Sequence, residues 1–147
     1  MPIPALDDGL LPPGVHQCTM QEIHDTFGTF QLSSRRCRLF EQLETFVSEI
    51  KSTGLVVAVI VDGSFVTGKP EPNDIDLILI LPAQHDFSSE LRPHVYNVLS
   101  RRQVRKRHGF DILIAVEGEP ELVKHREFFA RVRGQPRCEK GLLRVTL

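Results

Sequence analysis

The chain has 147 residues, of which 41% are hydrophobic and 25% charged, and its formal net charge is −1. This size and apolar content are typical of one compact domain, so we expect a single domain over residues 1–147. The longest apolar runs fall far short of the ~20 residues that span a bilayer, which argues against a membrane protein. The amino terminus lacks the basic start and apolar core of a secretory signal, so we expect a cytoplasmic protein.

Charge is spread unevenly along the chain. Residues 1–100 carry 6 basic and 13 acidic side chains, a sum of −7, whereas residues 101–147 carry 12 basic and 6 acidic, a sum of +6. Such asymmetry is typical of a protein with an anionic ligand or partner near the basic part. Alternatively, folding interleaves the two parts and the charges only solvate the surface.

The amino-terminal part is predicted to be an extended segment followed by a short helix. Its first fifteen residues are rich in Pro and Gly, so residues 1–18 are expected to run extended over the surface. Thr19 and Glu22 have the spacing of a capping box, which predicts a helix over residues 20–27 that ends at Gly28.

A longer helix is predicted to lead into the first main strand. It should begin after Ser33 or Ser34 and run to Ser52, because apolar residues recur on one face and Gly54 lies just past the end. Residues 55–61 are apolar at every position and rich in β-branched side chains. That composition favours a central strand that is buried on both faces.

Two more strands are predicted in the middle of the chain. Residues 63–73 are rich in turn formers and should return the chain for an antiparallel strand over residues 74–81. A helix is expected to begin after Ser88 or Ser89 and to end in a basic run, before a third strand over residues 110–116. This helical segment is long enough to let the second and third strands pair in parallel.

The remaining elements complete the predicted fold. A last helix is expected over residues 120–133, with Phe128 and Phe129 in the core, and a short strand over residues 142–147. The predicted fold class is therefore α/β (α+β), a mixed β-sheet with flanking helices.

Aspartates are predicted to gather at one end of this sheet. Asp74 and Asp76 should share a face of their strand, because residues two apart point to the same side. Asp111 opens the third strand, so parallel pairing would bring it to the same end. The antiparallel return would bring Gly63 and Ser64 there as well.

Such a cluster has to be neutralised. Two unit charges about 4 Å apart repel by about 4 kcal/mol at an effective dielectric constant of about 20. Either a carboxyl group takes up a proton or divalent cations bind. Aspartates at the end of a rigid sheet favour cations, and a pair of metal ions can hold both the attacking and the leaving oxygens of a nucleotidyl transfer. Asp62, by contrast, is expected to point away from the cluster and to be structural.

The Gly63-Ser64 pair suggests a phosphate-binding turn. Glycine lets the backbone approach a phosphate closely or take a positive φ, and a serine hydroxyl with free amides can hold phosphate oxygens. A metal-bound polyphosphate between this turn and the aspartates would explain why the carboxylates are adjacent.

The order of these residues resembles the DNA polymerase β-like nucleotidyltransferase superfamily, and most closely its small, minimal members. A Gly-Ser turn, an Asp-Ile-Asp sequence that opens a strand and a lone aspartate on a later strand carry the resemblance, over the expected catalytic core at residues 55–116. The resemblance implies that Asp74, Asp76 and Asp111 bind two Mg²⁺ (or Mn²⁺) ions. It also implies that Asp111 helps to activate an acceptor hydroxyl and that the Gly-Ser turn holds the triphosphate of an NTP.

Three features qualify the resemblance. The segments LPPGVH and EKGLLRVTL resemble an uncharacterised bacterial branch of the superfamily, which implies no particular substrate. Many minimal members continue the Gly-Ser turn with a small residue, an arginine and a glycine, whereas residues 65–68 read FVTG. Because that arginine is missing, nucleotide binding is expected to depend on Lys69 or on the basic run. The chain also lacks the larger relatives' helical domain that holds the nucleotide base, so a partner protein is one expectation.

The basic run Arg101–His108 has two interpretations. It directly precedes the strand of Asp111 and suits the phosphates of RNA or of a nucleotide, or an acidic protein partner. Alternatively, it is a solvated helix end whose cations complement the helix dipole.

Two functions remain open from the sequence. The first is a nucleotidyltransferase that passes an NMP from an NTP to a hydroxyl of a protein, an RNA or a small molecule and releases pyrophosphate. The second is a non-catalytic binding module with the same fold, for example the antitoxin component of a toxin–antitoxin or defence system. The altered turn and the absence of the larger relatives' helical domain favour the second.

Overall fold

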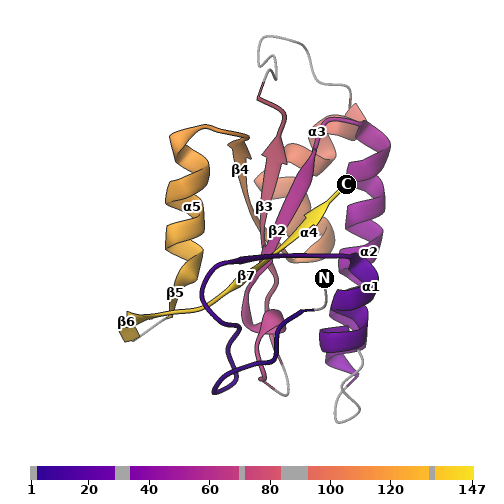
Figure 1. The fold of residues 1–147 in the computed structure, drawn as a ribbon. Coiled ribbons are helices and arrows are strands. Elements are labelled where there is room, and N and C mark those ends of the chain that lie inside the picture. Colours follow the sequence, from indigo (N-terminus) through magenta and orange to yellow (C-terminus); the bar gives the residue numbers. More distant parts are fainter. Residues whose placement is uncertain (1–2, 29–33, 70–71, 84–92, 133–134) are drawn as a thin grey trace.

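In a computed structural model, the chain forms a five-stranded mixed sheet with helices on both faces (Figure 1). The structure describes residues 3–28, 34–69, 72–83, 93–132 and 135–147. The strand order is β1-β7-β2-β3-β4, and β5 and β6 form a separate two-stranded ribbon. The predicted class, a mixed sheet with flanking helices, is confirmed at this level.

The elements have the following bounds in chain order. They are β1 (Val15–Cys18), α1 (Met20–Ile23), the π-helical turn η1 (His24–Gly28), α2 (Arg35–Thr53), β2 (Ala58–Asp62), the 3₁₀ turn η2 (Ser64–Val66), β3 (Asp76–Leu81), α3 (Pro93–Leu99), α4 (Arg101–His108), β4 (Asp111–Val116), α5 (Pro120–Ala130), β5 (Arg131–Val132), β6 (Gln135–Glu139) and β7 (Leu142–Thr146).

The amino-terminal part follows the prediction except that it contains one additional strand. The capping box is present, since the Thr19 hydroxyl accepts from the Glu22 amide at 3.1 Å and the Glu22 carboxylate accepts from the Thr19 amide at 3.2 Å. The helical segment reaches Gly28 as expected, with a π-helical second half. The extended segment, however, ends in β1, which pairs in parallel with β7. No sequence signal near β1 identifies a partner this distant.

The central strands pair as predicted. β2 and β3 are antiparallel, and β3 and β4 are parallel. β3 begins at Asp76 rather than at Asp74, so Asp74 lies in the preceding loop. The described part of the crossover contains two helices rather than one, because Ser100 leaves the helix and caps α4 by accepting from the Gln103 amide at 3.3 Å. The helix start expected at Ser88 or Ser89 lies outside the described residues.

The carboxyl-terminal part contains elements that the sequence did not predict. α5 ends at Ala130, where the chain turns into β5 and then pairs with β6. β7 was expected as a short strand, and it lies inside the sheet, between β1 and β2. Among the described residues, no helix is both long and apolar enough to cross a lipid bilayer.

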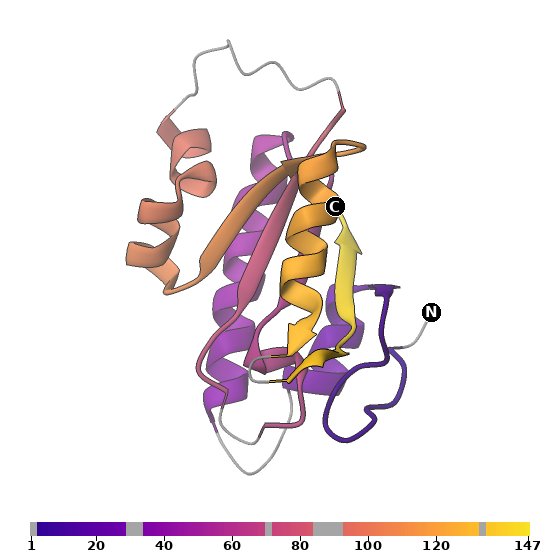
Figure 2. The same ribbon diagram turned by 90° about the vertical axis from the view of Figure 1, so that its left-hand side faces the viewer.

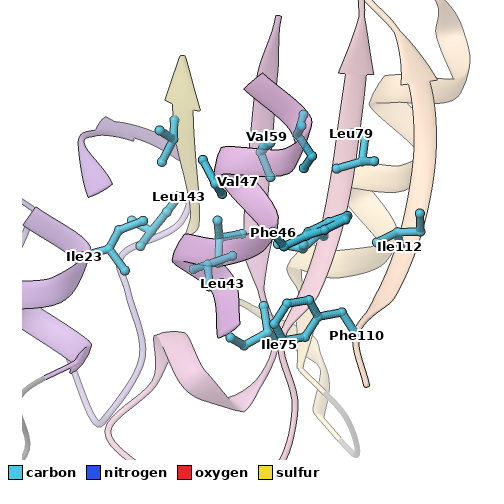
Figure 3. Packing of buried hydrophobic residues seen from close by; sticks show 14 of the residues in the cluster. Ile23, Leu43, Phe46, Val47, Val59, Ile75, Leu79, Phe110, Ile112 and Leu143 are labelled. Carbon is cyan, nitrogen blue, oxygen red and sulfur yellow. The ribbon is translucent and has the colours of Figure 1, made fainter. Parts of the chain in front are cut away.

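The two faces of the sheet are covered differently. Figure 2 shows α5 on one side of the sheet and α2 on the other. The α2 side holds the larger core cluster, in which Phe46 of α2 packs near Phe110 and Ile112 (Figure 3). We call this side the α2 face and the opposite side the α5 face. The α5 face is covered by a smaller cluster: Ala58, Ile60, Ile78, Ile80, Ala115, Leu122, Phe129 and Leu142.

α5 contacts the sheet through only one side. Leu122 and Phe129 are buried and lie two helical turns apart, on the same side of the helix. Phe128 is 64% exposed, so the prediction that it belongs to the core is wrong, whereas that for Phe129 is confirmed. A single-residue step moves a side chain about 100° around a helix, which is enough to turn Phe128 away from the sheet.

Candidate functional site

Three aspartates on adjacent strands form a row across one end of the sheet. The register pairs Asp62 of β2 with Asp76 of β3, and Asp76 with Asp111 of β4. Side chains that are paired directly across strands lie on the same face. Each aspartate is also two positions from a residue of the α5 face, namely Ile60, Ile78 and Leu113. We call Asp62, Asp76 and Asp111 the aspartate row.

The expectation that Asp62 points away from the other aspartates is therefore wrong. Both faces of β2 are apolar, so the sequence pattern alone did not show which face Asp62 shares with Asp76. Pairing of Asp62 with Asp76 in the ladder decides the question. A local signal did exist. Asp62 lies two residues after Ile60 and Asp76 lies two residues before Ile78, so an antiparallel pairing of Ile60 with Ile78 also pairs the two aspartates.

Asp62 is buried and has a cationic partner. Its residue is 3% exposed, and the ammonium group of Lys140 lies 2.9 Å from its Oδ1. Burial raises the pKa of the Asp62 carboxyl, and Lys140 together with the Gly63 amide opposes that rise. Lys140 comes from the loop between β6 and β7 and was not singled out in the sequence. Its distance of 78 residues from Asp62 leaves no local signal that could have identified it.

Asp74 is held by the turn that was expected to hold phosphate. Its Oδ1 accepts from the Ser64 amide at 3.0 Å and from the Ser64 hydroxyl at 2.5 Å. Burial acts to raise the pKa of Asp74, but the Ser64 hydrogen bonds, with help from Lys140 and Lys69, bring it below its ordinary value. The Ser64 hydroxyl also accepts from the Asn73 amide at 3.0 Å. In this structure the donors of Ser64 thus bind Asp74.

Gly63 is required by the close packing of this turn. Its φ is +95°, and a Cβ atom at this position would lie 2.7 Å from the Asp74 carbonyl oxygen. Both observations exclude a side chain. The positive φ expected for this glycine is present, whereas its predicted role in approaching a phosphate stays a prediction.

A buried arginine shapes the same turn from the α2 face. Arg36 is fully buried, and its guanidinium donates to the carbonyls of Phe65 at 2.6 Å and Thr67 at 2.7 Å, and also to that of Lys69. Burial lowers the pKa of Arg36. Arg36 therefore stabilises the turn by binding its backbone carbonyls. Its spacing of four residues from Phe40, on the buried side of the helix, is the signal that could have revealed it.

Asp76 lies at the centre of the negative charge. It is half-buried, and its pKa is raised to about 6, first by burial and then by Asp74, Asp62 and Asp111, with Lys140 acting in the opposite direction. The carboxylates are therefore close enough to influence one another electrostatically. At neutral pH this part of the surface carries crowded negative charge.

Asp111 and the basic run meet at the exposed end of the row. Arg105 Nη1 lies 3.1 Å from Asp111 Oδ1, and both side chains are more than half exposed. Arg107 pairs with Glu49 at 2.7 Å, and the His108 ring packs against both Phe46 and Phe110. The run is thus divided. Its second half ties α4 to α2, while its cations also lie in the last turn of α4, where they complement the helix dipole.

Lys69 is exposed, and its charge contributes to lowering the pKa of Asp74. Lys69 therefore lies near enough to Asp74 for its charge to act on that carboxylate. Its predicted role in binding a nucleotide stays a prediction.

The aspartates have the ligand chemistry that a divalent cation requires, but their side chains are not arranged around a common point. Hard cations such as Mg²⁺ prefer carboxylate oxygens, which Asp74, Asp76 and Asp111 supply. Within the ranges described above, no three or more His, Cys, Asp and Glu side chains are gathered in a way that could hold a metal ion. Asp74 is engaged by Ser64 and Asp111 by Arg105. The crowded charge on Asp76 is the observation that fits a cation here.

Comparison with known proteins gives one match. No curated protein matches the chain, and no solved structure does either. A family model described as a family of unknown function, DUF6932, matches residues 4–146. Because this match spans nearly the whole sequence, the chain belongs to the DUF6932 family.

Proposed function

We propose that the protein is a cytoplasmic, metal-dependent nucleotidyltransferase with a nucleotidyltransferase-like fold. It would transfer an NMP from an NTP to a hydroxyl of a protein, an RNA or a small molecule and release pyrophosphate. One observation carries the proposal: Asp76 is paired in register with Asp111 on a parallel neighbouring strand, beside the turn that holds Asp74. Carboxylates from two distant parts of the sequence, Asp74 and Asp76 in one and Asp111 in the other, thus lie near one end of the sheet.

The residues have separable roles in this proposal. Asp74, Asp76 and Asp111 would hold two Mg²⁺ or Mn²⁺ ions, which supply positive charge to a reacting phosphate when bound. Asp111 is exposed enough to orient an acceptor hydroxyl and take its proton. Lys69 and the Gly63-Ser64 turn would bind the triphosphate, and Ser64 would release Asp74 to do so.

The exposed cations of α4 would serve the acceptor. Arg101, Arg102 and Lys106 are exposed, and α4 leads directly to the strand of Asp111. A negatively charged acceptor, such as an RNA or an acidic protein, would be attracted to this helix.

The proposal is tested by label transfer. The purified chain is incubated with labelled NTPs, Mg²⁺ or Mn²⁺ and host extract, beside the Asp76→Asn and Asp74→Asn variants. The control is Asp25→Asn, which makes the same change at an exposed aspartate in η1. We expect the wild type and the control to transfer label and the two site variants to lose at least about 100-fold in rate, because a preorganised electrostatic contact is removed. Equal transfer by all four proteins would exclude the proposed role.

A second candidate function is favoured by the same turn. Ser64 is already bound to Asp74, and Asp111 to Arg105, as expected if the site no longer binds a nucleotide. In that case the chain would be a non-catalytic module, for example the antitoxin component of a toxin–antitoxin or defence system. Thermal unfolding with NTP and Mn²⁺ separates the two candidates. Ligand at about 100 times its Kd should stabilise the enzyme by about 2.7 kcal/mol and leave the binding module unchanged.

A further inference from the structure

β4 is an edge of the sheet with an open row of backbone groups. It lies at one end of the strand order and pairs only with β3. The Glu117 amide, just past β4, donates to the Leu81 carbonyl of β3 at 2.9 Å. Because the amides of a strand alternate between its two edges, those of Ile112 and Ile114 point away from β3. Within the described residues, these two amides have no hydrogen-bond partner.

β4 lacks the features that usually protect an edge strand. Such strands are short, bulged, or interrupted by Pro or charged residues. β4 is six residues long and pairs without a bulge, and apart from Asp111 at its start it contains no charged residue and no Pro. Leu113 and Ile114 are only partly buried, whereas every residue of β2 is buried. The opposite edge strand, β1, is shorter and has His16 and Gln17 in its middle. β4 is therefore the edge to which another strand can add.

Helix α4 brings positive charge to this edge. Figure 2 shows α3 and α4, in salmon, lying past β4 on the open side of the sheet, and α4 contacts β4. Arg105 contacts Asp111 of β4 at 3.1 Å, whereas Arg107 contacts Glu49 of α2 at 2.7 Å, on the other side of the helix. Arg101 lies one helical turn before Arg105 and is therefore also on the β4 side. It is exposed, and in the part of the chain that the structure describes it has no ion-pair partner.

The edge and the charges together define the side chains of an added strand. Val104 of α4 belongs to the core of the α2 face, so α4 lies on that side of the sheet. Alternate side chains of an added strand would point towards α4, where acidic groups would meet Arg101 and Arg105. The others would point towards the α5 face, where Leu113 is partly buried and packs with the apolar cluster. The matching strand therefore alternates acidic and apolar residues.

Two other occupants fit less well. Antiparallel pairing of two β4 strands would bring the α4 helices of both copies to the same side of the sheet. Because α4 reads RRQVRKRH and contains no acidic residue, the two helices would repel each other. A nucleic acid would suit the cations, but it offers no regular row of amides and carbonyls to pair with the edge.

We propose that the open edge of β4 binds an extended segment of a partner protein, in which acidic and apolar residues alternate, as a sixth strand of the sheet. In this mode of recognition the main-chain hydrogen bonds give affinity and the alternate side chains give specificity. The inference goes beyond the proposed function, since it requires neither a nucleotide nor a metal ion.

The first test uses a defined peptide and the full chain. The probe is a fluorescein-labelled peptide of about seven residues in which Glu and Val alternate, and binding is followed by fluorescence anisotropy. Two further peptides carry N-methyl groups, one on every Glu and the other on every Val. Only one of these sets can turn its amides towards β4, so we expect one methylated peptide to bind like the parent and the other to lose binding. A peptide with Lys in place of Glu is the charge control and should not bind.

The second test locates the peptide by amide hydrogen exchange, measured by NMR. In the free chain the amides of Ile112 and Ile114 should exchange much faster than that of Leu113, which points towards β3. With the peptide at about ten times its Kd, the first two should exchange about tenfold more slowly, and Leu113 should not change.

A pair of variants tests the charge. Arg101→Gln should weaken binding of the acidic peptide by about two- to fivefold, as expected for an exposed ion pair. Arg38→Gln is the matched control at an exposed arginine of α2 and should leave binding unchanged. Equal affinity of both variants and the wild type would contradict the assignment of acidic side chains to the α4 side.

Several results would overturn the inference. Binding of both methylated peptides, or of the Lys peptide, would show that no ladder forms or that charge does not select the partner. No binding at about 1 mM peptide would do the same. Slow exchange at Ile112 and Ile114 in the free chain would mean that the edge is already covered, and a dimer in sedimentation would then identify a second copy as the occupant. None of these results changes the label-transfer assay, so the proposed function is tested separately.

Discussion

The two faces of the sheet bury similar kinds of side chain, but they differ in how completely helices cover them. The α2 face is packed by side chains from α1, α2, α3 and α4, and it contains most of the phenylalanines of the core. The α5 face is covered by one helix, and at one end its apolar rows give way to the aspartate row.

This difference explains why the charged side chains gather on the α5 face, while most of the apolar packing lies on the α2 face. Charged groups have a high desolvation cost under dense apolar packing, so a cluster of carboxylates costs less free energy where helices cover the sheet less completely. Arg36 is the exception on the α2 face, and it is satisfied by backbone carbonyls of the turn. The following predictions test whether the two faces can be disturbed separately.

The largest effect is expected on the α2 face. Phe46→Ala removes a fully buried ring that packs against Phe110 and His108, and should lower the free energy of unfolding by about 3–5 kcal/mol. Phe128→Ala makes the same change at an exposed position of α5 and should alter it by less than about 0.5 kcal/mol. Urea denaturation of both variants is the measurement. Similar losses for the two would mean that α5 packs against something through Phe128.

The next effect is expected at the turn before the aspartates. Gly63→Ala should cost roughly 2–3 kcal/mol, because it combines a positive φ with a contact of 2.7 Å to the Asp74 carbonyl oxygen. Gly118→Ala has a similar φ of +82° but no atom within 4 Å of the added Cβ, so about 1 kcal/mol is expected. Denaturation curves of both variants separate backbone strain from close packing, and an equal cost would show that packing at Gly63 contributes nothing.

Asp76→Asn is expected to stabilise the protein in a pH-dependent way. The native Asp76 keeps its proton up to about pH 6, whereas an unfolded aspartate loses it near its ordinary pKa. Between these values the native state binds more protons, so the stability of the wild type falls as the pH rises to about 6 and then levels off. At pH 8 the variant should be more stable by on the order of 1 kcal/mol, after allowance for solvent screening.

The measurement is the free energy of unfolding between pH 4 and pH 8. Asp25→Asn provides a control of opposite sign, because the His24 hydrogen bond, with that of Gln21, lowers the pKa of Asp25. A wild-type profile that rises through this range in parallel with that of Asp76→Asn would contradict the crowding of charge at Asp76.

The smallest effect on stability is expected at the exposed end of the row. Arg105→Met breaks an ion pair whose side chains are 74% and 54% exposed, so unfolding should change by less than about 0.5 kcal/mol. If the proposed function is right, the same variant binds Mn²⁺ more tightly, because Asp111 is released. Thermal unfolding with and without Mn²⁺ measures both effects. A large loss of stability without Mn²⁺ would show that Arg105 is part of the core.

Much of the fold followed from local patterns in the sequence. The capping box at Thr19, the glycine after α2 and the central strands were predicted because the interactions that form them are close in the chain. The antiparallel and parallel pairings of β3 also followed, since the lengths of the connections allowed little else. β1 and the β5–β6 ribbon were missed, because short strands depend on partners that local propensity does not reveal.

The site was predicted to a similar extent. Asp76 and Asp111 were brought together by strand alternation and parallel pairing, as expected. The face of Asp62 and the approach of Lys140 depend on register and on a distant loop, so no short stretch of sequence contains them. Arg36 was missed because a charged residue in the first turn of a helix is usually exposed.

The position of β7 determines when the strands of the sheet can pair during synthesis on the ribosome. β7 lies between β1 and β2, so residues from the beginning of the chain stay without their neighbouring strand until residues 142–146 have been synthesised. The rest of the sheet can assemble earlier, because β2, β3 and β4 are in place by residue 116. Lys140 lies just before β7 and is partly buried, so it can reach the acidic end of the sheet only after β2, β3 and β4 have been synthesised.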